Sequence, residues 1–133
     1  MLPKNAFIIA VDFDGTIVED AYPSIGKPML FAFDTLKNLQ SQGHRLILWT
    51  YRTGSKLEEA VAFCKKNGID FYAVNKSFPE EIFNEKYSRK IHADFFIDDR
   101  NIGGFLGWTK IHKLILNYEP EIKKRKGFFF FFK

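Results

Sequence analysis

Cysteine is nearly absent from this sequence, and the sequence has no hydrophobic run long enough to cross a membrane. The single cysteine, Cys64, excludes a disulfide within the chain and is typical of a reducing compartment. A membrane-spanning helix needs about 20 consecutive apolar residues, and no segment approaches that length. The N-terminus leads directly into a predicted strand, so we expect no signal peptide. These absences favour a cytoplasmic protein without a membrane partner.

Excess charge is also scarce over most of the chain. The net charge is +4, but residues 109–133 hold seven Lys and Arg against two Glu, which is a net charge of +5. Residues 1–108 therefore carry a net charge of −1. A basic end of this kind is usually exposed to solvent. The charge distribution gives little support to a nucleic-acid-binding surface on the body of the chain.

The length of 133 residues predicts one domain with its own hydrophobic core. We place that domain at residues 1–126, followed by a phenylalanine-rich tail at residues 127–133. The five consecutive phenylalanines of the tail have no amphipathic period. We assign the tail no catalytic role, although an exposed apolar cluster favours association between copies of the chain. A homo-oligomer is therefore a possible state.

Strand-like and helix-like patterns alternate along the sequence. Such alternation is typical of βαβ units, which build an α/β fold with a mainly parallel sheet. A capping-box pattern, Ser55-Lys-Leu-Glu58, predicts the start of the second helix. The predicted strands are 6–12, 44–49, 69–74 and 93–97, and the predicted helices are 29–42, 55–66 and one around 111–118, with a short helix or turn at 79–88.

Polar residues follow three of the four predicted strands, at the end where ligands bind in open α/β sheets. Two acids follow the first strand, a hydroxyl follows the second, and two acids follow the fourth, with a lysine just before it. Carboxylates of this kind suit Mg²⁺, and a cation with a lysine offsets the charge of a phosphoryl group. A carboxylate nucleophile would form an aspartyl phosphate. These residues are Asp12, Asp14, Thr50, Lys90, Asp98 and Asp99.

The segment Asp12-Phe-Asp-Gly-Thr16 after an apolar strand resembles the first signature of the haloacid dehalogenase-like (HAD) superfamily of phosphohydrolases. Thr50 matches its second motif, Lys90 its third, and Asp98-Asp99 its fourth, in the family's order. The Trp-Thr-x-Arg and Ile-Asp-Asp-Arg-Asn stretches are similar to those of small, capless, uncharacterised bacterial members. The resemblance implies a three-layer α/β/α Rossmann-like fold with a mainly parallel sheet.

The resemblance also implies a Mg²⁺-dependent phosphatase. Asp12 is expected to be the nucleophile, and Asp14 the acid that protonates the leaving group and then the base that activates water. The metal is expected to be held by Asp12, the backbone carbonyl of Asp14 and Asp98, with Asp99 helping through water. The acid role of Asp14 requires a raised pKa, which burial and the charge of Asp12 would provide.

The remaining motif residues are expected to bind the phosphoryl group. Thr50 would donate a hydrogen bond to a phosphoryl oxygen, and Lys90 would pair with the nucleophile and the phosphate. Lys76, which follows the third predicted strand, is an alternative to Lys90. Arg52 is either solvated, structural or a contact to substrate.

Larger relatives insert a cap domain after the first motif or between the second and third motifs. Neither interval is long enough here, so we expect no cap and an open site. An open site suits a phosphorylated small molecule or a macromolecule such as a nucleic-acid end.

Two other functions remain open on the sequence. The first is a catalytically idle binding or scaffold protein with the HAD fold. The second is a signalling module similar to a response-regulator receiver, which also places acids, a hydroxyl and a lysine on a parallel sheet. The order of motifs disfavours the receiver, because its paired acids follow the first strand and its phosphoacceptor comes later.

Overall fold

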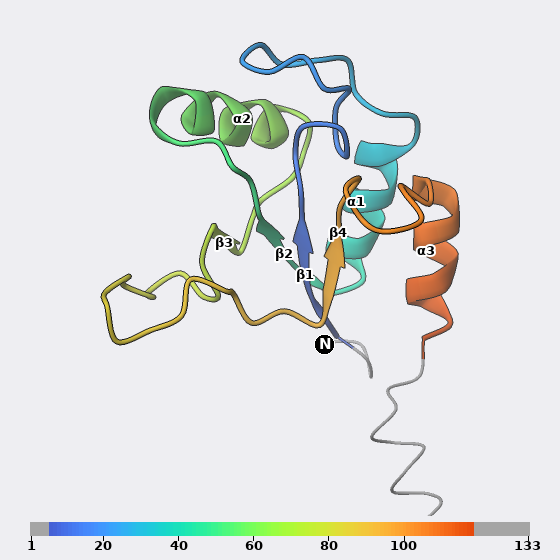
Figure 1. The fold of residues 1–133 in the computed structure, drawn as a ribbon. Helices are drawn as coiled ribbons and strands as arrows, with labels where there is room; N and C mark the ends of the chain where they lie inside the picture. Colours follow the sequence, from blue (N-terminus) through green and yellow to red (C-terminus); the bar gives the residue numbers. More distant parts are fainter. Residues whose placement is uncertain (1–5, 119–133) are drawn as a thin grey trace, which may run out of the picture.

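A computed structural model describes residues 6–118 of the chain, in which four strands and three helices follow one another in the predicted order (Figure 1). The predicted domain boundary at residue 126 and the phenylalanine-rich tail lie outside the described residues. The elements in order are β1 (Ile8–Val11), α1 (Ala32–Ser41), β2 (Arg45–Leu48), α2 (Gly54–Lys66), β3 (Ala73–Val74), β4 (Phe95–Ile97) and α3 (Trp108–Leu116).

All four strands are parallel and lie in the order β3-β2-β1-β4. Val11, the last residue of β1, pairs with Leu48 of β2 and Ile97 of β4, which are also the last residues of their strands. The carboxyl ends of these three strands therefore meet at one edge of the sheet. The predicted α/β class with a parallel sheet is confirmed.

The main core lies on the face of the sheet that Ile9 and Val11 of β1 share. All three helices contribute to it, and Figure 1 shows α1 and α3 side by side, in agreement with the contacts between them. Burial of these apolar side chains is the dominant favourable term in folding. The buried helical residues of this core are Ala32, Phe33, Leu36, Leu39, Ala60, Cys64, Trp108, Ile111 and Ile115.

A smaller core lies on the other face, where Ala10 and Ile47 point because side chains alternate along a strand. Ile91, from the connection between β3 and β4, packs on them. That connection contains turns and no helix, so the predicted element at 79–88 is a turn. The predicted third layer of helices is not confirmed within the described residues, because an irregular segment covers this face.

Several element ends differ from the prediction. Helix α2 begins at Gly54 after an extended Thr53, and no side chain caps it. The predicted capping box is therefore wrong, because Ser55 already lies in the first helical turn. Strand β3 has only two residues, and α3 begins at Trp108. None of the helices between residues 6 and 118 has both the length and the apolar character that a membrane crossing requires.

The segment between β1 and α1 arches over the carboxyl end of the strands (Figure 1). Its backbone is joined by hydrogen bonds from Gly15 to Val18 and from Glu19 to Lys27. The buried Trp108 anchors its first turn, because its indole Nε1 donates a hydrogen bond of 2.8 Å to the carbonyl of Thr16. Helix α3 thus fixes the turn that follows the first acids.

We expect Trp108→Phe to lower the free energy of unfolding by about 1–3 kcal/mol, because the buried Thr16 carbonyl loses its donor. The matched control is Trp49→Phe on the other face, where the indole makes no hydrogen bond among the described residues. Urea unfolding followed by circular dichroism measures both variants. Equal losses of stability would contradict the anchoring role of Trp108.

Candidate active site

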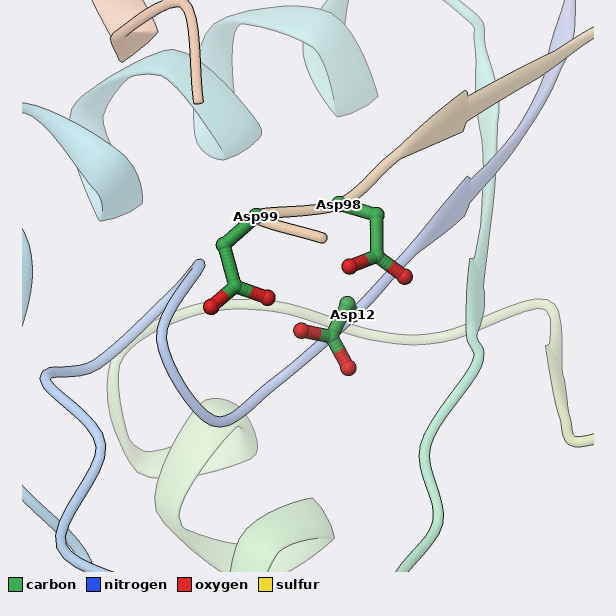
Figure 2. Close-up of side chains that lie close together, drawn as sticks. All are labelled: Asp12, Asp98 and Asp99. Carbon is green, nitrogen blue, oxygen red and sulfur yellow. The ribbon is translucent and has the colours of Figure 1, made fainter. Parts of the chain in front are cut away.

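Three carboxylates meet at the carboxyl edge of the sheet (Figure 2). Asp12 follows β1, whereas Asp98 and Asp99 follow the neighbouring β4. The backbone N–H of Asp12 donates to the carbonyl of Ile97 at 2.9 Å, which holds the two strand ends together. One oxygen from each carboxylate lies within 4.8 Å of the others. The structure therefore brings together Asp12, Asp98 and Asp99 as the sequence predicts.

The three carboxylates repel one another. Burial, together with the neighbouring charge of Asp98, raises the pKa of Asp12 from 3.8 to about 7. The Thr16 hydroxyl opposes this shift by donating a hydrogen bond of 3.0 Å to Asp12. The Oδ1 atom of Asp99 is buried and has no hydrogen-bond partner. Among residues 6–118, no cationic side chain forms an ion pair with these three acids.

A divalent cation fits this arrangement. Hard cations such as Mg²⁺ are bound through carboxylate oxygens, and the cluster offers at least three within a small volume. The unpaired oxygen of Asp99 gives the strongest support, because a buried polar atom without a partner is unfavourable unless something binds it.

Gly15 is required where the chain turns beside this cluster. Its φ of +84° lies in the left-handed region that favours glycine. A Cβ at this position would also collide with the carboxylate of Asp99. Only glycine therefore allows the first turn and the acids after β4 to approach so closely.

Asp14 points to a different partner. The guanidinium of Arg52 donates to both of its carboxylate oxygens, from Nε at 2.8 Å and from Nη2 at 2.7 Å. Arg52 is 1% exposed, and its remaining donors reach backbone carbonyls. Of the three roles predicted for Arg52, the geometry supports the structural one. The solvated and substrate-binding roles are wrong, because the side chain is buried and no donor remains for a substrate.

Thr50 lies two residues after β2, at the same edge as the acids. Its Oγ1 accepts a hydrogen bond of 3.1 Å from the backbone N–H of Arg52, so the hydroxyl proton stays available for a ligand. The side chain of Asn75 accepts a hydrogen bond of 2.8 Å from the Thr50 backbone N–H. Asn75 adopts a φ of 55°, a conformation that asparagine tolerates better than most residues.

Lys90 is not brought to the carboxylates. It is exposed, and four residues later the backbone N–H of Asp94 donates a hydrogen bond to the carbonyl of Ile8, at the amino end of β1. Figure 1 shows this connection reaching the sheet at the amino end of β4, opposite the acids. Lys76 is half-buried and lies two residues after β3, so it follows the carboxyl end of a strand, as the acids do. Its position favours Lys76 over Lys90 as the lysine of the site.

Sequence reasoning did not identify Asn75, Trp108 or the side-chain role of Thr16. Asn75 directly follows the predicted strand 69–74. A polar residue at that position could have been recognised as a site residue, because the other site residues also follow strands. The contact of Trp108 with Thr16 joins residues 92 positions apart and has no local signal.

The fold and the site define an α/β protein with an acidic cluster at the carboxyl edge of a parallel sheet. A solved structure from Bacteroides thetaiotaomicron, described as a conserved protein coded by a locus of that organism, is 52% identical to the chain with a TM-score of 0.81. The match covers 87% of this chain and 94% of that one. The chain belongs to the family of that conserved protein. No protein-family model matches the sequence, and neither does any curated protein.

The shifted pKa of Asp12 predicts how stability depends on pH without metal. The folded chain binds the Asp12 proton more tightly than the unfolded chain, so stability is lost as pH rises between about 4 and 7. In EDTA, we expect Asp12→Asn to be more stable than the unsubstituted protein by about 1–2 kcal/mol at about pH 8 and not at about pH 4. Burial lowers the pKa of His44 and gives an opposite slope, but this is shared by both proteins. A pH-independent difference in urea unfolding would contradict the prediction.

The collision at Gly15 gives a second prediction. Gly15→Ala and Gly103→Ala both place a side chain at positive φ, which costs about 1–2 kcal/mol each. Only the Gly15 variant also displaces Asp99, since the Gly103 position is open. We expect thermal stabilisation by Mg²⁺ to be lost in Gly15→Ala and retained in Gly103→Ala. Retention in both variants would show that Asp99 does not need this close approach.

Proposed function

We propose that this protein is a cytoplasmic Mg²⁺-dependent phosphomonoester hydrolase of the HAD type that acts through an aspartyl phosphate. The observation that carries the proposal is the cluster of Asp12, Asp98 and Asp99 at the sheet edge, in which one oxygen of Asp99 is buried and has no hydrogen-bond partner. The order of the four sequence motifs agrees with it. The side chains needed for phosphoryl transfer lie at the ends of adjacent strands, which is where such folds bind ligands.

Asp12, Asp98 and Asp99 would hold the cation, which supplies positive charge to a phosphoryl group when it is bound. A carboxylate oxygen of Asp12 attacks phosphorus, and the bond from phosphorus to the leaving oxygen breaks. Asp14 would give that oxygen a proton, for which its carboxylate must first take up a proton and release one of the two bonds from Arg52. Asp14 then takes a proton from a water that attacks the phosphorus, which releases inorganic phosphate and restores Asp12. The Thr50 hydroxyl orients a phosphoryl oxygen.

The same proposal includes a HAD architecture without a cap domain, in which the segment between β3 and β4 covers the second face of the sheet in place of a helical layer. In support of it, the segment between β1 and α1 packs on the body of the chain through Thr16, Ile17 and Val18, which are fully buried. The site then stays open toward solvent. An open site suits a phosphorylated small molecule or the phosphorylated end of a nucleic acid, and a second copy of the chain would be a natural cover.

One observation favours a second candidate, a catalytically idle binding or scaffold protein with this fold. Lys90 is exposed and makes no ion pair within the described part of the chain, so the third motif supplies no cation to the site. If Lys76 supplies the positive charge instead, the enzyme proposal stands. The variants Lys76→Met and Lys90→Met form a matched pair that tests which lysine acts at the site.

We expect the purified protein to hydrolyse an aryl phosphate with Mg²⁺ and to lose that activity in EDTA. Asp12→Asn removes the nucleophile and should reduce kcat by at least about 1,000-fold, because a covalent step has no substitute. Lys76→Met should reduce kcat more than Lys90→Met. Release of inorganic phosphate measures each variant, with Asp34→Asn on the exposed face of α1 as the control. No release above background from the unsubstituted protein would favour the idle alternative.

A further inference from the structure

Every donor of the buried Arg52 guanidinium is used within the chain. Nε and Nη2 hold the two oxygens of Asp14 at 2.8 and 2.7 Å. Nη2 also donates to the Ser24 carbonyl at 2.8 Å, and Nη1 donates to the carbonyls of Pro23 and Lys56 at 3.3 and 3.4 Å. A planar guanidinium with five donors can meet all these acceptors, whereas the ammonium of lysine has three.

Two aromatic rings enclose the same guanidinium. Its central carbon lies 5.0 Å from the ring centre of Phe13 and 5.1 Å from that of Tyr22. Phe13, which lies between Asp12 and Asp14 in the sequence, is fully buried. Tyr22 belongs to the arching segment and is exposed. Cation–π contacts of this kind hold a ring and a guanidinium at a fixed separation.

Residues 20–25 form the outer part of the arching segment, and the contacts with Arg52 hold this part to the body of the protein. The other hydrogen bonds of residues 20–25 in the described chain are local, from Tyr22 to Asp20 and from Ser24 to Ala21. Its connections to the body of the protein are the bonds from Arg52 and the apolar packing of Ile25. Arg52 therefore links this segment to Asp14 directly.

Arg52 is itself fixed to the second strand. Its backbone N–H donates to Thr50 Oγ1 at 3.1 Å, and Thr50 is held in turn by Asn75. A change in the position of Arg52 therefore displaces Asp14 and the segment 20–25 relative to the edge of the sheet.

We propose that Arg52 is a positioning residue that couples the carboxylate of Asp14 to the segment 20–25. It orients Asp14 and holds the segment through one rigid guanidinium, and it does not contact the substrate. The kinetic consequence rests on the proposed phosphatase function, whereas the structural coupling does not.

The kinetic test is a double-mutant comparison of Arg52→Gln and Asp14→Asn with an aryl phosphate. We expect Arg52→Gln alone to lower kcat about 10- to 100-fold with little change in KM, because misplacement of a catalytic group has an effect of this size. In the Asp14→Asn background, the same change should lower kcat by less than about 3-fold, because the partner is already lost. Arg52→Lys should not restore kcat, since it cannot reproduce the paired bonds.

Arg45→Gln is the matched control, because Arg45 is the first residue of β2, the strand that leads to Arg52, and is exposed. It should leave kcat unchanged. Equal losses of kcat from Arg52→Gln in both backgrounds would overturn the proposal, because Arg52 would then not act through Asp14.

Hydrogen exchange of residues 20–25 tests the coupling without any activity. We expect exchange in this segment to be at least about 10-fold faster in Asp14→Asn, in which the bonds of Arg52 are disturbed while Arg52 itself remains. Exchange in Arg45→Gln should match the unsubstituted protein. Unchanged exchange in Asp14→Asn would overturn the coupling. Faster exchange in a protein that hydrolyses no phosphate would uphold the coupling and contradict only the proposed phosphatase function.

Discussion

Repulsion among carboxylates at one edge of a parallel sheet is the constraint on which the rest of this structure depends. The pairing of β1 with β4 fixes the backbone positions of Asp12, Asp98 and Asp99, so the acids cannot separate without breaking the sheet. Burial and the neighbouring charge of Asp98 then raise the pKa of Asp12 to about 7. A bound divalent cation is the simplest way to stabilise such a cluster in its charged form.

The surroundings of the cluster are built to keep it in place. Gly15 gives room to Asp99, the Thr16 hydroxyl donates to Asp12, and Trp108 of α3 holds the backbone of the same turn. Arg52 performs a similar task for Asp14 on the other side of the turn. The two acids of the first motif thus have different environments. Without a cation the raised pKa belongs to Asp12, the proposed nucleophile, whereas the proposed acid Asp14 is held by Arg52. The proposed roles therefore require a bound cation that offsets the charge at Asp12 and a protonation step at Asp14.

Much of the fold could be predicted from the sequence, because strand and helix patterns alternate and strand ends carry the acids. The positions of Asp12, Asp98, Asp99 and Thr50 followed from that local pattern. The role of Arg52 could not be decided among the three predicted roles, because its partners Pro23, Ser24 and Lys56 offer backbone carbonyls, which leave no mark in a sequence. Lys90 was chosen because it lies just before the fourth predicted strand and fits the third motif, but the irregular path between β3 and β4 carries it to an exposed position. Packing between distant segments decided both cases.

The central claim is that the carboxylates after β1 and β4 form a cation site. Calorimetric titration with Mg²⁺ tests this most directly, on the unsubstituted protein, on Asp98→Asn and on Asp34→Asn as a control from the exposed face of α1. We expect one Mg²⁺ bound per chain in the unsubstituted protein and in Asp34→Asn, with binding weakened at least about 10-fold in Asp98→Asn. Equal binding in all three proteins, or no binding in the unsubstituted protein, would contradict the central claim.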